Sequence, residues 1–131
     1  MKSISLSTKG RDSLTDVTAQ VQKAVLESGV KNGLCLVYCP HTTAGLTINE
    51  NADPAVPRDI ITVLDRMVPW TGGYAHAEGN TAAHVKSSMM GCSAKIIIED
   101  GQLVLGTWQS VFFCDFDGPR SRRFMVQVIS S

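Results

Sequence analysis

The chain has no excess of charge of either sign. Twelve lysines and arginines balance twelve aspartates and glutamates among 131 residues, and the sequence pI is about 6.8. Non-specific binding to nucleic acid or to an anionic membrane depends on a positive surface, so we expect neither partner. Any anion that the protein binds has to be recognised by a local group of residues.

Long apolar runs, repeats and linkers are absent as well. No segment approaches the roughly 18 apolar residues of a membrane span. The first seven residues alternate polar and apolar side chains, unlike the apolar core of a signal peptide. No proline- or glycine-rich stretch divides the chain. We therefore expect one domain over residues 1–131, soluble and located in the cytoplasm.

Cysteines are few, and their spacing does not indicate a disulfide framework. Cys35, Cys39, Cys92 and Cys114 lie in apolar runs or beside small residues. Three residues separate Cys35 from Cys39, whereas zinc and redox pairs usually have two between them. We expect buried, reduced thiols in the core.

The apolar spacing predicts an α+β domain with a mainly antiparallel sheet. Alternation predicts strands at residues 4–6 and 46–48, and an unbroken apolar run predicts a strand covered on both faces. The expected order is β-α-β-β-α-α-β-β-β. The remaining predicted strands are 34–39, 94–99, 103–116 and 123–129.

Capping residues mark three helices. The first begins at Thr15 or Asp16 and ends at Gly29. The second follows Asp53 and the first-turn proline and stops before residue 69. The third is capped by Asn80 and ends at Gly91.

All three histidines fall in two polar-rich stretches, residues 41–51 and 76–84. His41 follows a predicted core strand, and His84 lies one turn beyond Asn80. Together with His76, they could supply three imidazole nitrogens to a divalent metal, zinc or magnesium, with a position left open for water or substrate. Their wide spacing forms no short ligand motif. The alternative is that they form hydrogen bonds in a polar interface.

Arg120 is the preferred phosphate contact, because it follows a turn where a guanidinium can form paired hydrogen bonds with an anion. Thr42, Thr43 and Ser87 or its neighbour could add hydroxyl donors. The alternative for Arg120 is a salt bridge to Asp117 or to another subunit. Arg122 and Arg123 begin a strand and are expected to be solvated.

A second polar group follows the predicted strand at residues 46–48. Asn49 and Asn51 share one face and could orient a ligand, and Glu50 could act as a base. Within the predicted strand 103–116, Trp108 could stack on a heterocycle and Gln109 presents an amide on the opposite face. Each of these residues also has a purely structural interpretation at a strand end, in a core or in an interface.

Five segments in order resemble the YjbQ-like family. They are His41-Thr42-Thr43-Ala44, Asn49-Glu50-Asn51, residues 80–84, Gly106-Thr107-Trp108-Gln109 and Asp117-Gly118-Pro119-Arg120. The resemblance spans nearly the whole chain. It implies the YjbQ-like α+β sandwich, usually assembled as a homotrimer.

The family has been described as a secondary type of thiamine-phosphate synthase. Such an enzyme joins an aminopyrimidine methyl diphosphate to a thiazole phosphate and releases pyrophosphate. On this basis His41, Glu50, Asn80 and His84 are the candidate catalytic residues. A metal-dependent hydrolase or transferase acting on another phosphorylated small molecule remains an alternative, as does a non-enzymatic trimeric ligand-binding module.

Overall fold

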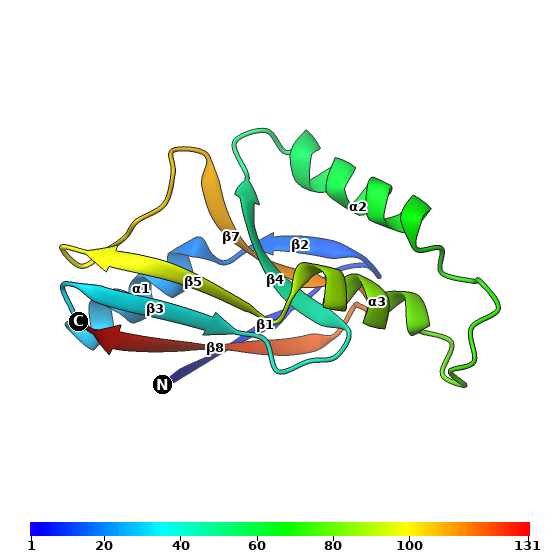
Figure 1. Ribbon diagram of the computed structural model, residues 1–131, viewed down its shortest axis with the longest axis horizontal. Helices are drawn as coiled ribbons and strands as arrows, with labels where there is room; N and C mark the ends of the chain where they lie inside the picture. Colours follow the sequence, from blue (N-terminus) through cyan, green and yellow to red (C-terminus); the bar gives the residue numbers. More distant parts are fainter.

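A computed structural model describes residues 1–131 as two antiparallel sheets and three helices (Figure 1). The larger sheet has the strand order β1-β8-β3-β5-β6 and the smaller has the order β2-β7-β4. The predicted α+β class and antiparallel pairing are confirmed, and two short strands, β2 and β6, add to the predicted order. The elements are β1 (Lys2–Ser7), β2 (Ser13–Asp16), α1 (Thr18–Ser28), β3 (Gly33–Tyr38), β4 (Ala44–Glu50), α2 (Ala55–Met67), α3 (Thr81–Met90), β5 (Ser93–Glu99), β6 (Gln102–Leu103), β7 (Gln109–Asp115) and β8 (Ser121–Ser130).

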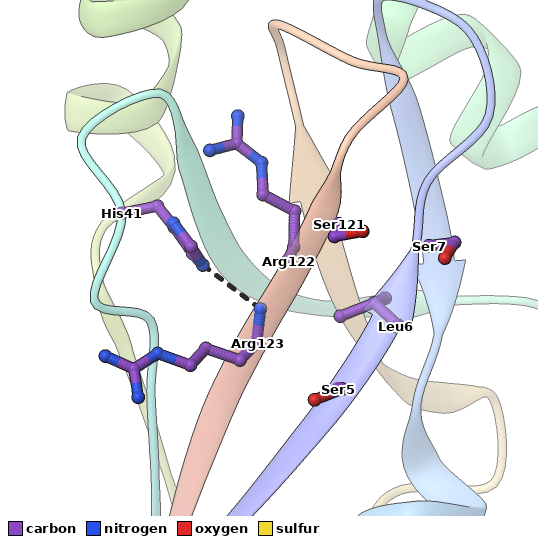
Figure 2. Close-up of a pocket in the computed structure, with 7 residues that line it drawn as sticks. All are labelled: Ser5, Leu6, Ser7, His41, Ser121, Arg122 and Arg123. Atoms are coloured by element: carbon purple, nitrogen blue, oxygen red, sulfur yellow. Dashed lines mark hydrogen bonds between the residues drawn. The ribbon is translucent and has the colours of Figure 1, made fainter.

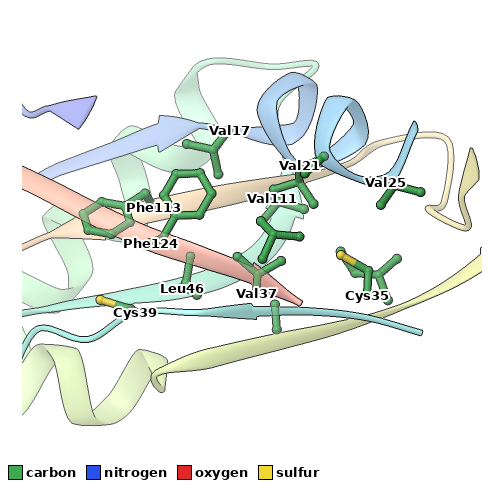
Figure 3. Close-up of a cluster of buried hydrophobic side chains, with 14 of the residues drawn as sticks. Val17, Val21, Val25, Cys35, Val37, Cys39, Leu46, Val111, Phe113 and Phe124 are labelled. Atoms are coloured by element: carbon green, nitrogen blue, oxygen red, sulfur yellow. The ribbon is translucent and has the colours of Figure 1, made fainter. Parts of the chain in front are cut away.

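The main core lies between the inner faces of the two sheets and α1. Val21 of α1, Val37 of β3, Phe113 of β7 and Phe124 of β8 are all fully buried there (Figure 3). A strand presents alternate residues to opposite faces, so the neighbours of Phe113 face the other way. Alternate side chains of β7 therefore belong to two separate apolar clusters, one on each face of the strand.

The second cluster is covered by α2 and α3. Leu64 of α2 and Ala83 of α3 pack with Phe112 and Cys114 of β7 and with Phe116, which follows it. The smaller sheet is therefore sandwiched between the larger sheet and a helical layer. This arrangement sets α3 against β4, on the side of the sheet where the histidines gather.

The strand over residues 34–39 is buried on one face only, contrary to the prediction. Cys35 and Val37 are buried, whereas Leu34 and Tyr38 are 36% and 42% exposed. No helix or sheet covers this outer face of β3. Leu34 lies between Ile129 of β8 and Ile97 of β5 in the strand register, so an apolar row crosses the outer face.

Most predicted helix boundaries are confirmed. The Asp16 carboxylate accepts a hydrogen bond from the Thr18 N–H at 2.9 Å, and the Asp53 carboxylate accepts one from the Ala55 N–H at 2.9 Å. Gly29 ends α1 with a φ of 73°. Asp16, like Thr15, lies in β2, and the N-cap positions of α1 and α2 are occupied by Val17 and Pro54, one residue later than predicted. No helix is long and apolar enough to cross a membrane.

The predicted strand over residues 103–116 is interrupted. β6 ends at Leu103 and β7 begins at Gln109, with a turn between them. The Gln109 side-chain oxygen accepts a hydrogen bond from the Gly106 N–H at 2.8 Å and closes this turn. Trp108 therefore lies in the turn, 63% exposed, rather than in a strand.

Candidate functional site

All three histidines line one polar cavity of about 400 Å³. Apart from Pro40, every lining residue is polar or charged. We call it the three-histidine pocket, and its residues are Pro40, His41, Thr42, Thr43, His76, Glu78, Asn80, His84, Asp117, Arg120 and Arg122. They come from the β3–β4 loop, the α2–α3 loop, α3 and the segment from β7 into β8.

Close packing of α3 on β4 brings these segments together. The Ser87 hydroxyl of α3 donates to the Thr42 carbonyl at 2.6 Å, and the Leu46 N–H donates to the Gly91 carbonyl at 3.0 Å. A Cβ at Gly45 would lie 2.6 Å from the Gly91 carbonyl oxygen. The approach thus depends on the absence of a side chain at Gly45, and the Ser87 hydroxyl is used to hold the β3–β4 loop.

His76 and His84 are neighbours in the pocket. Their ring centroids are 5.3 Å apart and their planes meet at 84°. His84 is half-buried on α3, whereas His76 is exposed in the loop before it. The pairing brings together two groups that can transfer protons near neutral pH or bind a cation.

His41 points across to β8. Its Nε2 accepts a hydrogen bond from the Arg123 N–H at 3.1 Å, so the neutral ring carries its proton on Nδ1 (Figure 2). Burial lowers the pKa of His41, and the positive charge of Arg122 lowers it further. This nitrogen is therefore engaged with the backbone and faces away from a shared metal.

No group of three or more histidine, cysteine, aspartate or glutamate side chains is arranged to hold a metal ion in this chain. Two of the three predicted imidazole ligands, His76 and His84, do lie together. The third, His41, lines the same pocket but has its Nε2 bonded to β8. The three predicted histidines thus line one cavity, but their nitrogens do not converge on one metal position.

Arg120 forms a salt bridge to Asp117, which was the predicted alternative to a phosphate contact. Its guanidinium lies 3.1 Å from the Asp117 carboxylate, and its Nε donates to the Asp117 carbonyl at 2.7 Å. The side chain is still 54% exposed. Because a guanidinium has five N–H donors, Arg120 retains donors for an anion.

Arg122 is buried, and the expectation that it is solvated was wrong. Its side chain is 7% exposed and donates to both oxygens of Asp115, at 3.0 and 2.8 Å, and to the Thr43 hydroxyl at 2.7 Å. Alternation along β8 turns Arg122 inward, and the fully buried Asp115 compensates its charge. Burial alone would raise the pKa of Asp115, but hydrogen bonds from Arg122 and Thr8 outweigh that effect and lower it.

Asn80 does not cap α3 with its side chain, contrary to the prediction. Its amide nitrogen donates to the Asp117 carboxylate at 2.9 Å instead, and no side-chain cap bond is present. The amide oxygen is buried and has no hydrogen-bond partner in the chain. A buried acceptor without a partner is costly, so a water molecule, a ligand donor or a cation is needed to satisfy this oxygen.

The second predicted polar group lies elsewhere. Asn49 and Glu50 occupy the far end of β4, a seven-residue strand that spans about 20 Å, and Asn51 follows directly after it. Glu50 pairs with Gln109 of β7, and the Asn51 amide donates to Asp16 at 2.8 Å. With Trp108 beside them, these residues do not reach the three-histidine pocket of the same chain.

Two acidic residues of the pocket, Glu78 and Asp117, were not predicted to act on a ligand. Asp117 is paired with Arg120, whereas Arg122 is paired with Asp115 outside the pocket lining, so Glu78 is the carboxylate without an arginine partner. Glu78 lies two residues after His76 in the same polar stretch, and that stretch was the available signal. Asp117 is identified only by the fold, which turns it toward Asn80.

The chain matches the family described as UPF0047 protein YjbQ-like over residues 2–131. A UPF0047 protein of Methanocaldococcus jannaschii is 52% identical, with 95% of this chain and 90% of that protein covered. The UPF0047 protein YugU of Bacillus subtilis is 48% identical, with 98% of each covered.

Solved structures agree with the fold along the whole chain. An uncharacterised conserved protein of the YjbQ/UPF0047 family from Clostridium acetobutylicum superposes with a TM-score of 0.97 at 55% identity, covering 98% of this chain and 100% of that one. A protein of unknown function from Sulfolobus solfataricus gives a TM-score of 0.95 at 32% identity, with 99% and 96% covered.

Proposed function

The chain belongs to the YjbQ-like UPF0047 family, and we propose that it binds and transforms a phosphorylated small molecule in the three-histidine pocket. The observation that carries the proposal is the convergence of His76, His84 and Arg120 in one polar cavity. Imidazoles can exchange protons with a phosphate, and a guanidinium can neutralise it. We place the protein in the cytoplasm, where phosphorylated metabolites occur.

The reaction that we propose is of the thiamine-phosphate synthase type. The carbon–oxygen bond to the diphosphate breaks, and its electron pair leaves with pyrophosphate. The thiazole nitrogen donates its lone pair to the pyrimidine methylene, forming the new carbon–nitrogen bond. Free N–H groups of Arg120 stabilise the negative charge that develops on the leaving group.

We further propose that His76, His84 and the unpartnered Asn80 oxygen are the ligands that one chain offers to a divalent cation, zinc or magnesium. Nitrogen and amide oxygen donors suit such ions, and a cation satisfies the buried acceptor. When bound, the ion supplies charge neutralisation beside the diphosphate. Zinc titration by calorimetry tests this assignment, because His76→Ala and His84→Ala both weaken binding if the two rings share the ion.

A homotrimer completes the proposal. The outer face of the larger sheet exposes the apolar row of Leu34, Ile97 and Ile129, the latter two 62% and 50% exposed. Burial of such a row between subunits is favourable, at about 25 cal/mol per Å² of apolar surface. Light scattering after size exclusion should give three times the monomer mass, and Ile97→Lys should reduce it.

Product analysis tests the reaction. The purified protein is incubated with both phosphorylated substrates, and thiamine phosphate is measured by mass spectrometry. We expect His84→Ala to lower the rate by at least about a hundredfold, because it removes one of the two imidazoles that we propose hold the charge-neutralising cation. Asn49→Ala is the matched control, since Asn49 lies at the far end of β4 and should retain the wild-type rate.

Each possible result decides between the functions. Absence of thiamine phosphate with wild-type protein would remove the synthase reaction. Release of phosphate or pyrophosphate without the thiazole acceptor would instead identify a hydrolase or transferase that acts on another phosphorylated compound. Equal rates for wild type and folded His84→Ala would contradict a catalytic role of the three-histidine pocket.

A further inference from the structure

A second and larger cavity shares His41 and Arg122 with the three-histidine pocket and has a volume of about 650 Å³. We propose that it is a separate anion site for a phosphate or a phosphate monoester. The inference does not depend on the proposed reaction, because it rests on Arg123 and on serines that do not line the three-histidine pocket. We call it the β1–β8 pocket, and its residues are Ser5, Leu6, Ser7, His41, Ser121, Arg122 and Arg123 (Figure 2).

The strand register builds this pocket. In the antiparallel pair β1–β8, Ser5 lies opposite Arg123 and Ser7 lies opposite Ser121. Residues two apart share one face of a strand, so the three serines and Arg123 lie together on one face. Arg122 points to the other face, where Asp115 holds it.

The donors on this face have no partners within the chain. The Arg123 guanidinium has no carboxylate within 4.0 Å and forms no side-chain hydrogen bond, and the hydroxyls of Ser5, Ser7 and Ser121 form none either. By contrast, Arg120 and Arg122 are both paired with aspartates. Arg123 is therefore a cation that is free to bind an anion.

The charge of the β1–β8 pocket favours an anion more clearly than that of the three-histidine pocket. Its seven lining residues include two arginines and no carboxylate. Since Asp115 compensates Arg122, the uncompensated charge is that of Arg123. A phosphate oxyanion matches this set, because a guanidinium binds two of its oxygens at once and hydroxyls donate to the rest.

His41 holds the backbone of this site in place. By accepting the Arg123 N–H, it anchors the residue whose guanidinium we assign to the anion. The cavity volume lies within the usual range for small-molecule sites and leaves room for an organic group beside the phosphate. A phosphate monoester therefore fits as well as inorganic phosphate.

Titration of the ¹⁵N-labelled full chain with inorganic phosphate, and separately with glycerol phosphate, tests the site by NMR. We expect saturable shifts of the amide signals of Ser5, Ser121 and Arg123. Arg123→Gln retains the backbone N–H that His41 accepts but removes the charge, and it should weaken binding about tenfold. Arg66→Gln is the matched control, because Arg66 is an exposed arginine of α2 outside this pocket.

The two ligands and the two pockets give distinct readouts. Tighter binding of glycerol phosphate than of phosphate identifies an ester as the ligand class, and equal binding identifies the free anion. Non-saturable shifts, equal affinity in Arg123→Gln, or equal weakening in Arg66→Gln would overturn the proposal. Failure of the three-histidine pocket would appear separately, in the signals of His76, Asn80 and His84.

Discussion

The imidazole of His41 extends the hydrogen-bond ladder between β3 and β8. Backbone pairing between the two strands ends at Tyr38 and Met125. Two residues before Met125 in β8, the N–H of Arg123 donates to the Nε2 of His41 at 3.1 Å. A side chain thus replaces a backbone carbonyl at the point where the chain turns away into the β3–β4 loop.

His41 should titrate below the ordinary histidine pKa of about 6.5. Burial and Arg122 lower its pKa in the folded protein, so the neutral ring is the form that favours folding. The stability that it contributes is complete above the unfolded pKa and is lost as the pH falls through the folded pKa. NMR titration of the ring signals measures the midpoint.

His41→Gln separates the hydrogen bond from the titration. The glutamine oxygen can accept the Arg123 N–H but does not bind a proton between pH 5 and 7. The variant should therefore fold and lose this part of the pH dependence of stability. A His41 midpoint above 6.5 in the wild type would show that the folded state favours the protonated ring and would contradict this assignment.

Asp115→Asn should destabilise the protein by about 3–5 kcal/mol at pH 7, because it leaves the charge of Arg122 buried without a counter-ion. Asp115 is fully buried and forms two hydrogen bonds with that guanidinium. Urea unfolding measures the loss. Asp59→Asn on the exposed side of α2 is the control and should change stability little.

The Asp115–Arg122 pair also predicts that the protein loses stability at low pH. The pKa of Asp115 is lowered in the folded state, so its contribution is present above the unfolded value of about 3.9 and disappears as the pH falls toward the folded value. Stability of the wild type should fall in this range. An equally steep loss of stability at low pH in Asp115→Asn would contradict the assignment.

Lys86→Met should also be destabilising. Lys86 is 1% exposed, and its ammonium lies 3.0 Å from Asp65 and 3.4 Å from Asp12. Removal of the cation leaves two carboxylates that Arg11 alone has to compensate, and because Asp65 is 46% exposed the cost should be about 1–3 kcal/mol. Restoration of part of the lost stability by adding Asp65→Asn would confirm that charge, rather than packing, is the cause.

Gly45→Ala should displace α3 from β4. The new Cβ would meet the Gly91 carbonyl at 2.6 Å, and overpacking of this kind costs about 1–3 kcal/mol. Because α3 carries His84, the variant should also shift the ring signals of His76 and His84. Gly29→Ala is the control: it has open space around its Cβ and a similar positive φ of 73°, but it lies at the end of α1, outside the three-histidine pocket, and should leave these ring signals unchanged.

One of the four thiols should react with iodoacetamide in the native protein. Cys92 is exposed, whereas Cys35, Cys39 and Cys114 are buried. Burial raises the pKa of Cys35 to about 11 and that of Cys114 to about 12, which leaves almost no thiolate at neutral pH. Mass spectrometry after labelling counts the adducts, and Cys92→Ser should abolish labelling.

Local rules predicted most elements of the fold. Apolar alternation predicted most of the strands, and the predicted caps Asp16 and Asp53 lie one residue before the N-cap positions, where each accepts a helical N–H. The sequence misjudged β3, because an apolar run does not reveal whether a second layer covers each face. It also misjudged Asn80, because a side chain that can cap a helix can equally bond to Asp117 once the fold brings that carboxylate near.

The candidate site was predicted in part. The polar stretches at residues 41–51 and 76–84 identified the three histidines that line one pocket. Asn49, Glu50 and Asn51 belong to the first of these stretches but lie at the other end of β4. An extended strand separates residues that are only a few positions apart in the sequence, so they lie at opposite ends of the sheet. Closeness in the sequence therefore did not mean closeness in space.

By itself, the sequence determined the α+β class, the helix ends, the family resemblance and the residues able to perform chemistry, because these depend on local pattern and composition. Only the tertiary structure decided which partners those residues have. It buried Arg122 against Asp115, tied His41 to β8 and left Arg123 free among serines. Neighbouring residues of a strand face opposite sides, and what covers each side is set by segments far away in the chain.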